Sequence, residues 1–255
     1  MNLKVQHYID LIAVLTEKEI KVRYKSSVFG YLWSVAHPLA FALVFFVAFK
    51  VVVKIQVEDY ALFLIAGLFP WQWFANSVNA APRIFLGNAS IIKKVNFPRN
   101  IIPFTQVFQD MIHFILAIPV VVLFLFLYHK LPSFSWLYGI PVLLIIQFLM
   151  TYGICLMISS TNLFFRDLER LTIIFTTMLF YFTPVIYPEK MIPVKYKPLI
   201  NLNPLAPLMI SWRELFLNGT LSPLYLAVSF GYAILAFILG FLIYRKLSWK
   251  FAEVL

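Results

Sequence analysis

Asp110 and His113 are the first candidates for chemistry, because they lie within a long apolar stretch of the sequence. They are three residues apart, a spacing that places both on one face of a helix. Inside a membrane such a pair could bind a cation, relay a proton or serve as acid and base on a lipid head group. One carboxylate makes no relay chain, however. An Asp110 near the inner boundary, paired with a basic or backbone partner, is therefore the alternative.

Other residue types predict no further reactive site. The four histidines, His7, His37, His113 and His129, are scattered over different segments, which does not favour a metal site. The single cysteine, Cys155, lies in an apolar run and excludes a disulfide framework or a Cys-based zinc site. The sequence also contains no Gly-x-x-x-x-Gly-Lys-Ser/Thr loop. We therefore expect no catalytic residue, no metal and no cofactor in this chain.

Aromatic residues make up 18% of the chain and gather in three stripes. Aromatic rings can pack against the C–H faces of sugars, and because this contact is non-directional it lets a polymer slide. Each stripe alone is also typical of a core, a lipid-facing surface or an interfacial belt. The candidate channel-lining aromatics are Phe41, Phe45, Phe49, Trp71, Trp73, Phe74, Phe175, Tyr181 and Phe182.

The composition places these residues in a membrane. The 255 residues are 62% hydrophobic and only 13% charged, with a mean hydropathy of +0.87, and one soluble core cannot bury that much apolar surface. The net charge is +10, but Lys and Arg are divided among short connections and form no stripe, so we expect no nucleic-acid partner. The apolar stretch 11–15 is too short for a cleavable signal and runs directly into charged residues.

The fold class we predict is an all-α membrane protein with six transmembrane helices. A transmembrane helix needs about 20 largely apolar residues, and six stretches bounded by charged residues, Pro or Gly satisfy this. An N-terminal amphipathic interface helix would precede them, and short re-entrant helices would lie before the last span. The predicted spans are 35–55, 60–82, 103–128, 137–161, 170–188 and 223–244.

The N-terminal region differs from the apolar stretches that follow in its regular pattern of charged residues. Apolar and basic residues in 2–26 alternate with a period near 3.6, which predicts an amphipathic interfacial helix over 1–30, followed by a membrane domain over 31–255. A solvated helix bound to a partner is the alternative. Most Lys and Arg residues fall on the same side as the N-terminus, so the positive-inside rule places both termini in the cytoplasm.

The second inner connection combines apolar and basic residues. Ser90 can cap a short helix with Ile91, Ile92 and Val95 on one side and Lys93 and Lys94 on the other, which Phe97 and Pro98 would end. Such a helix is typical of a docking element. A basic loop that serves only topology is the alternative, although it does not explain the apolar face.

Two further connections are distinctive. The third inner connection contains Arg166 and Asp167, for which positive-inside charge and a helix cap are sufficient explanations. The outer segment 189–219 carries Asn203-Pro204, a helical run over 205–217 and Asn218-Gly219 as its end. We predict that it dips back into the outer leaflet and buries its apolar faces against protein. A plain extracellular loop is the alternative.

Several of these motifs together resemble the ABC-2 type polysaccharide export permeases, and the likeness extends over nearly the whole chain. The stretch 18–33 with His37-Pro38-Leu39 is similar to that family's N-terminal signature, Ile92–Arg99 to its cytoplasmic loop and Phe165-Arg166-Asp167 to its third-loop motif. Asn203-Pro204 completes the match. The N-terminal motif residues are Lys21, Arg23, Tyr24, Lys25, Gly30, Trp33 and Pro38.

The resemblance implies a homodimeric channel subunit in the bacterial inner membrane. It implies two copies of a separate ATPase subunit, which would bind ATP and Mg²⁺, and a lipid-linked glycan substrate carried on undecaprenyl, of the O-antigen, capsule or teichoic acid kind. Spans beginning near Trp33 and Leu171 would line the conduit, and residues 184–217 would form its outer gate. The implied ATPase-coupling residues are Ser90, Ile91, Ile92, Lys93, Lys94, Val95, Phe97 and Arg99.

Two other hypotheses remain open. The chain could be an ABC-2 exporter of drugs, ions or other lipids rather than glycans. It could also be an intramembrane lipid-modifying enzyme that uses Asp110 and His113, a hypothesis that rests only on their spacing.

Overall fold

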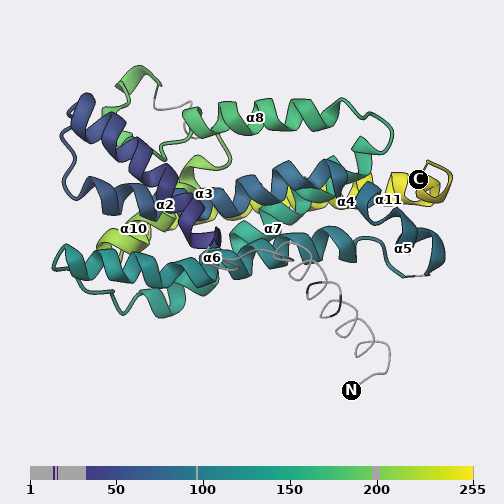
Figure 1. Cartoon of the computed structure of the whole chain (residues 1–255), viewed down its shortest axis with the longest axis horizontal. Helices are drawn as coiled ribbons and strands as arrows, with labels where there is room; N and C mark the ends of the chain where they lie inside the picture. Colours follow the sequence, from purple (N-terminus) through teal and green to yellow (C-terminus); the bar gives the residue numbers. More distant parts are fainter. Residues whose placement is uncertain (1–13, 15, 17–32, 96, 197–201, 255) are drawn as a thin grey trace.

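Helices make up the fold in the computed structural model, which describes residues 14, 16, 33–95, 97–196 and 202–254 (Figure 1). The predicted interface helix and the motif residues Lys21, Arg23, Tyr24, Lys25 and Gly30 lie outside the described residues. The elements are α2 (Trp33–Phe45), η2 (Phe46–Val52), α3 (Tyr60–Ala80), η3 (Ala81–Arg83), α4 (Ile84–Gly87), α5 (Ala89–Lys94), α6 (Ile101–Leu127), α7 (Trp136–Asn162), α8 (Leu168–Phe182), η4 (Glu189–Met191), η5 (Val194–Tyr196), α10 (Ala206–Asn218), α11 (Pro223–Leu247), η6 (Ser248–Lys250) and α12 (Phe251–Val254).

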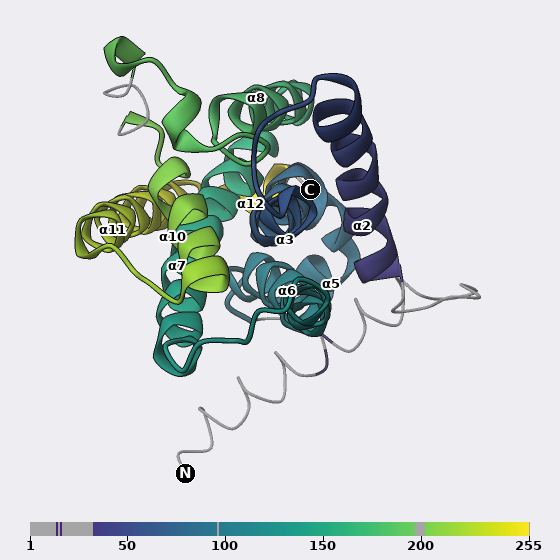
Figure 2. The same ribbon diagram turned by 90° about the vertical axis from the view of Figure 1, so that its left-hand side faces the viewer.

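Helix α3 is the centre of the fold. Figure 2 shows it enclosed by other helices, and it packs against α2, α6, α7, α8 and α10. The most apolar window of the helical stretch Tyr60–Gly87 is 83% buried, whereas that of Pro223–Lys250 is only 17% buried. Helix α3 therefore contacts protein on nearly every side, and α11 presents most of its surface outward.

Four helical stretches of the described chain are long and apolar enough to cross a membrane, beginning at Tyr60, Ile101, Trp136 and Pro223. They match four of the predicted spans within a few residues at most of their ends. Helix α2 runs without a break into the π-helix η2, and the two form a shorter apolar helix in place of the predicted 35–55.

The predicted span 170–188 is wrong at its C-terminal end. Helix α8 ends at Phe182 because Thr183 precedes Pro184, and a residue before proline is driven out of the helical region. Thr183 accordingly has φ −95° and ψ 135°. The residues that follow leave the helix axis and turn toward α10, so the helix is 15 residues long.

Helices α7 and α11 pack backbone to backbone at two glycines. A Cβ atom on Gly240 would lie 2.0 Å from the carbonyl oxygen of Gly153, and one on Gly153 would lie 2.5 Å from that of Ala236. Lipid tails are as apolar as Leu, so helix association in a membrane depends on such close van der Waals contact. Small residues at this crossing are therefore a condition of the observed packing.

The outer segment folds back onto α3. The predicted helical run over 205–217 is confirmed by α10, which ends at Gly219 with φ +66°, and most of its side chains are buried. Asn203 accepts a hydrogen bond from Leu205 N at 3.0 Å and donates to Thr183 Oγ1 at 2.9 Å. A plain loop is therefore excluded for residues 206–218.

Polar side chains connect α10 to its neighbours. Gln147 of α7 donates to the carbonyl oxygen of Pro70 at 2.8 Å and accepts from Trp212 Nε1 at 2.6 Å. Arg213 donates to the carbonyls of Pro184 and Val185, and its guanidinium carbon lies 3.8 Å from the centre of the Phe63 ring. These contacts join α3, α7, α10 and the chain after α8 into one packed unit.

Gly240→Ala should destabilise the protein, and Gly231→Ala on the same helix is its matched control. The added methyl at position 240 must push two backbones apart, and overpacking of this kind costs about 1–3 kcal/mol. Nothing lies within 4 Å of a Cβ on Gly231, so alanine there should be neutral or stabilise through its higher helix propensity. The measurement is the thermal unfolding midpoint in detergent. Equal midpoints for the two variants would contradict the packing described for α7 and α11.

Candidate functional site

The basic connection between α4 and α6 forms one end of the molecule, together with the C-terminus (Figure 1). Helix α5 begins at Ala89 and ends at Lys94, and Val95 is extended. The prediction that Ser90 caps this helix is wrong. Asn88 occupies the preceding position, and its side chain donates to the carbonyl oxygen of Ile84 at 3.0 Å, so it serves α4 rather than α5.

The apolar residues of α5 face inward. Ile92 and Phe97 are buried by the chain itself, and Ile91 is half-buried against the same core. The apolar side of the predicted docking helix is therefore not available for a partner in this structure, because its buried side chains pack against the core of the chain itself. Among residues 89–95, 97 and 98, the exposed ones are Ser90, Lys93, Lys94, Val95 and Pro98.

Arg99 is an internal contact rather than a free cation. Its Nη1 donates to the carbonyl oxygen of Ser248 at 2.7 Å, and its guanidinium carbon lies 6.0 Å from the centre of the Phe251 ring. Phe251 is fully buried, with its ring 4.8 Å from that of Phe85. Sequence reasoning missed Phe251, although an apolar residue between Lys250 and Glu253 was a usable signal.

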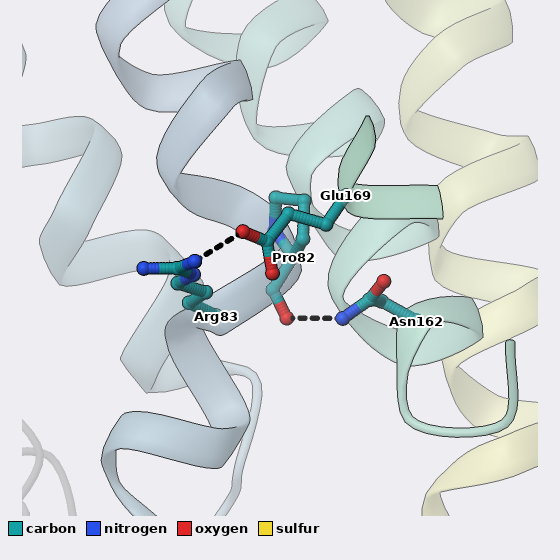
Figure 3. A network of polar contacts seen from close by, with 4 residues as sticks. All are labelled: Pro82, Arg83, Asn162 and Glu169. Carbon is teal, nitrogen blue, oxygen red and sulfur yellow. Dashed lines mark hydrogen bonds and ion pairs between the residues drawn. The ribbon is translucent and has the colours of Figure 1, made fainter. Parts of the chain in front are cut away.

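A second group of polar contacts lies where α3 ends and α8 begins (Figure 3). Arg83 pairs with Glu169, and Asn162 donates to the carbonyl oxygen of Pro82 at 2.8 Å. The hydrogen bond from Arg83 lowers the pKa of the Glu169 carboxyl from its usual value. These contacts hold η3 against both the end of α7 and the first turn of α8.

The third-loop residues Arg166 and Asp167 are exposed beside this group. Asp167 stands at the position before α8, but its side chain makes no capping hydrogen bond. The predicted helix cap is therefore not formed by this residue. The acid in the first turn of α8 is Glu169, which is paired with Arg83.

The predicted aromatics of α8 are exposed on its outer surface, and those of α2 and η2 are exposed or half-buried. Phe175, Tyr181 and Phe182 are 60%, 57% and 67% exposed. Phe41 is also exposed, whereas Phe45 and Phe49 are half-buried. The Phe45 ring lies 5.5 Å from that of Phe180, which brings α2 and α8 together at one side of α3. Trp33 at the start of α2 is exposed, and Pro38 is buried.

The predicted aromatics of α3 are placed differently. Trp71, Trp73 and Phe74 are at most 4% exposed because α3 is enclosed by other helices. Trp73 Nε1 donates to the carbonyl oxygen of Val107 at 3.2 Å, and its ring stacks on Phe114 at 5.6 Å. The prediction that these three residues line a channel is therefore wrong for this conformation, in which they form core.

Asp110 is enclosed at the contact between α3 and α6. Its Oδ2 accepts hydrogen bonds from Ser77 Oγ at 2.8 Å and from Gln106 Nε2 at 2.9 Å. His113, three residues on, is also buried. The alternative prediction of a partner for Asp110 is closest to this arrangement, although these partners are a hydroxyl and an amide rather than a basic or backbone group. Asp110 and His113 are thus both buried, which is typical of residues with a structural role.

Comparisons with a family model and with three related proteins bear on the function. The model of the family "ABC-2 type transporter" matches residues 10–217. The chain is 48% identical to the O-antigen export system permease protein RfbA of Klebsiella pneumoniae, over 100% of both chains. It is 29% identical to the protein of the same name from Myxococcus xanthus, over 84% of this chain and 82% of that one. It is 23% identical to the polysialic acid transport protein KpsM of Escherichia coli, over 83% of each.

Asp110→Leu should destabilise the protein more than Asp110→Asn. Leucine removes the acceptor of both Ser77 and Gln106, and a buried polar group left without its partner costs about 1–3 kcal/mol. Asparagine keeps an acceptor oxygen and the shape of the side chain. Thermal unfolding of the purified variants would measure the difference. If the Leu variant unfolded at the same temperature as wild type, the hydrogen bonds accepted by Asp110 would make no contribution to stability.

Proposed function

Because this chain belongs to the ABC-2 type transporter family, we propose that it is the membrane-spanning permease subunit of an ABC exporter for an O-antigen-like polysaccharide. The observation that carries the proposal is the 48% identity to an O-antigen export permease over the full length of both chains. The four apolar helical stretches agree with this, because a permease must cross the bilayer several times. The chain is thus a multi-pass membrane protein and a permease rather than an enzyme.

The energy for export is proposed to come from a partner. The permease would act as a homodimer with two copies of an ATPase subunit, and ATP and Mg²⁺ would be bound there. The substrate would be a glycan linked to undecaprenyl in the inner membrane. ATP binding can move the permease between two arrangements only if the ATPase contacts them differently.

The shorter helices are proposed to complete six spans. Helix α2 continued by η2 covers residues 33–52, which is close to the about 20 apolar residues that a membrane span needs. Helix α8 is shorter and would require local thinning of the bilayer or cover from a second copy. The exposed apolar residues of α8, among them Leu171, Phe175 and Phe182, provide a surface for that copy and for the conduit.

The end of the molecule that carries α5 is proposed to face the cytoplasm. Exposed Lys93 and Lys94 lie there, as do exposed Arg245 and Lys246 at the end of α11 and exposed Lys250 in η6. Excess basic residues mark the cytoplasmic side. The opposite end, with α10, would then lie in the outer leaflet as the predicted re-entrant helix and would form the outer gate.

The exposed side of α5 is proposed to receive the ATPase. Ser90, Lys93, Lys94 and Val95 face outward, whereas Ile92 and Phe97 set the position of the segment from inside. The two lysines would steer an acidic surface of the ATPase, since charges at an interface act on the rate and specificity of docking. Arg166 and Asp167 are exposed on the loop before α8 and are proposed to border this surface.

Deletion of the gene should remove long-chain glycan from the cell surface, and expression of this chain should restore it. Staining of surface polysaccharide is the measurement, and identification of glycolipid co-purified with the permease and ATPase would define the cargo. Normal surface glycan in the deletion strain, with loss of resistance to a drug, would contradict the proposed substrate and favour the drug-exporter alternative.

Lys93→Glu with Lys94→Glu should lower export at least tenfold while the protein still inserts in the membrane. The reversed charges repel an acidic ATPase surface, so ATP hydrolysis and export become uncoupled. The matched control is Arg245→Glu with Lys246→Glu, which makes the same change of net charge on exposed residues in the last turn of α11, at the same end of the molecule. Wild-type export by the Lys93 and Lys94 variant would reject the coupling role of α5.

A further inference from the structure

We propose that the C-terminal segment, η6 with α12, is a strut that holds α5 in position, and that Phe251 is its positioning residue. The inference rests on the proposed role of α5 as the ATPase-docking element. Figure 1 shows the C-terminus at the same end of the molecule as α4 and α5. Residues 248–254 thus lie beside a connection more than 140 positions earlier in the chain, as the contact of Arg99 with Ser248 also shows.

Helix α5 depends on neighbouring elements for its orientation, although Ile92 and Phe97 also anchor this connection in the core. It has six residues, and a helix this short is marginal without tertiary contacts. Among its side chains only Ile92 is buried. The position of its exposed lysines therefore depends on the elements before and after it, α4 and the start of α6.

The C-terminal segment contacts the elements on both sides of α5. Before α5, the Phe85 ring of α4 packs on Phe251 at 4.8 Å. After α5, Arg99 donates to the carbonyl oxygen of Ser248 at 2.7 Å and places its guanidinium over the Phe251 ring. Asn100 N also donates to the hydroxyl of Tyr244, at 3.1 Å. The two ends of the connection are therefore held to one surface formed by the end of α11 and α12.

Phe251 is the centre of this surface. Its side chain is fully buried, and its ring contacts Tyr244 at 6.0 Å as well as Phe85 and Arg99. Trp249, two residues earlier, is 67% exposed. The segment thus turns one aromatic residue into the protein and another outward, which provides a matched pair of large side chains to remove.

A movement of the ATPase that displaces α5 would be transmitted to α4, α6 and α11 only if α5 is held rigidly against them. With Phe251 in place, α4, α6 and α11 must move together with α5. Without it, α5 could yield locally, and ATP would be hydrolysed without movement of the helices. The inference therefore concerns the coupling of hydrolysis to export and not the presence of the docking residues.

The first arm of the test measures the position of α5 without the ATPase. A nitroxide on Ser90→Cys reports mobility at an exposed site, and buried Cys155 can stay in place. In the purified full-length permease, Phe251→Ala should increase label mobility, Trp249→Ala should leave it unchanged, and Phe251→Leu should restore most of the order. Identical spectra for Phe251→Ala and Trp249→Ala would overturn the inference, whatever the role of α5.

The second arm measures coupling in proteoliposomes with the ATPase. Phe251→Ala should still co-purify with the ATPase but should export at least fivefold less glycan per ATP hydrolysed, and Phe251→Leu should recover the ratio. An unchanged ratio would overturn the inference, as would a loss of export that only follows the amount of folded protein. If the Lys93 and Lys94 variant also exported normally while label mobility rose, the failure would lie in the proposed coupling role instead.

Discussion

Polar contacts around α3 are the constraint on which the other helices depend. In hydrocarbon there is no water to satisfy buried polar groups and little hydrophobic force between helices, so close packing and internal hydrogen bonds must hold the bundle. Gln147 satisfies the carbonyl of Pro70 on α3 and the indole of Trp212 on α10 at the same time. Asp110 of α6 accepts from Ser77 of α3. Each enclosing helix that makes such a contact has its depth and rotation fixed relative to α3.

Helix α3 also connects the two ends of the molecule. Helix α10 lies against α3 and holds the residues after α8 through Arg213. At the other end, η3 and α4 continue directly from α3 and lead into α5. The contact of Arg83 with Glu169 ties this same continuation to the first turn of α8. A displacement of α5 that moves α4 would therefore also act on α3 and on the first turn of α8.

The sequence could predict those features that depend on local pattern. Long apolar runs gave the four long helices, and Asn218-Gly219 marked the end of α10 correctly. The end of α8 was also readable, since Thr183 precedes a proline. The orientation of α5 was not, because Phe251 lies far along the chain from the connection it contacts. Trp71 and Trp73 of α3 were assigned to the channel rather than to the core. The sequence could not show their burial, because enclosure by five helices leaves no periodic signal in a uniformly apolar segment.

The exposed face of α8 differs from a typical polar binding site. No charged residue occurs between Arg170 and Phe182. Thr177 is exposed on this face, and its hydroxyl donates to the carbonyl oxygen of Ile173 at 2.8 Å, whereas Thr172 and Thr176 are buried. Hydroxyls already bonded within their own helix have less capacity to hold a passing ligand. With exposed aromatic rings beside Thr177, this face offers weak, non-directional contacts, the kind along which a sugar polymer would slide if the face lines the conduit as proposed.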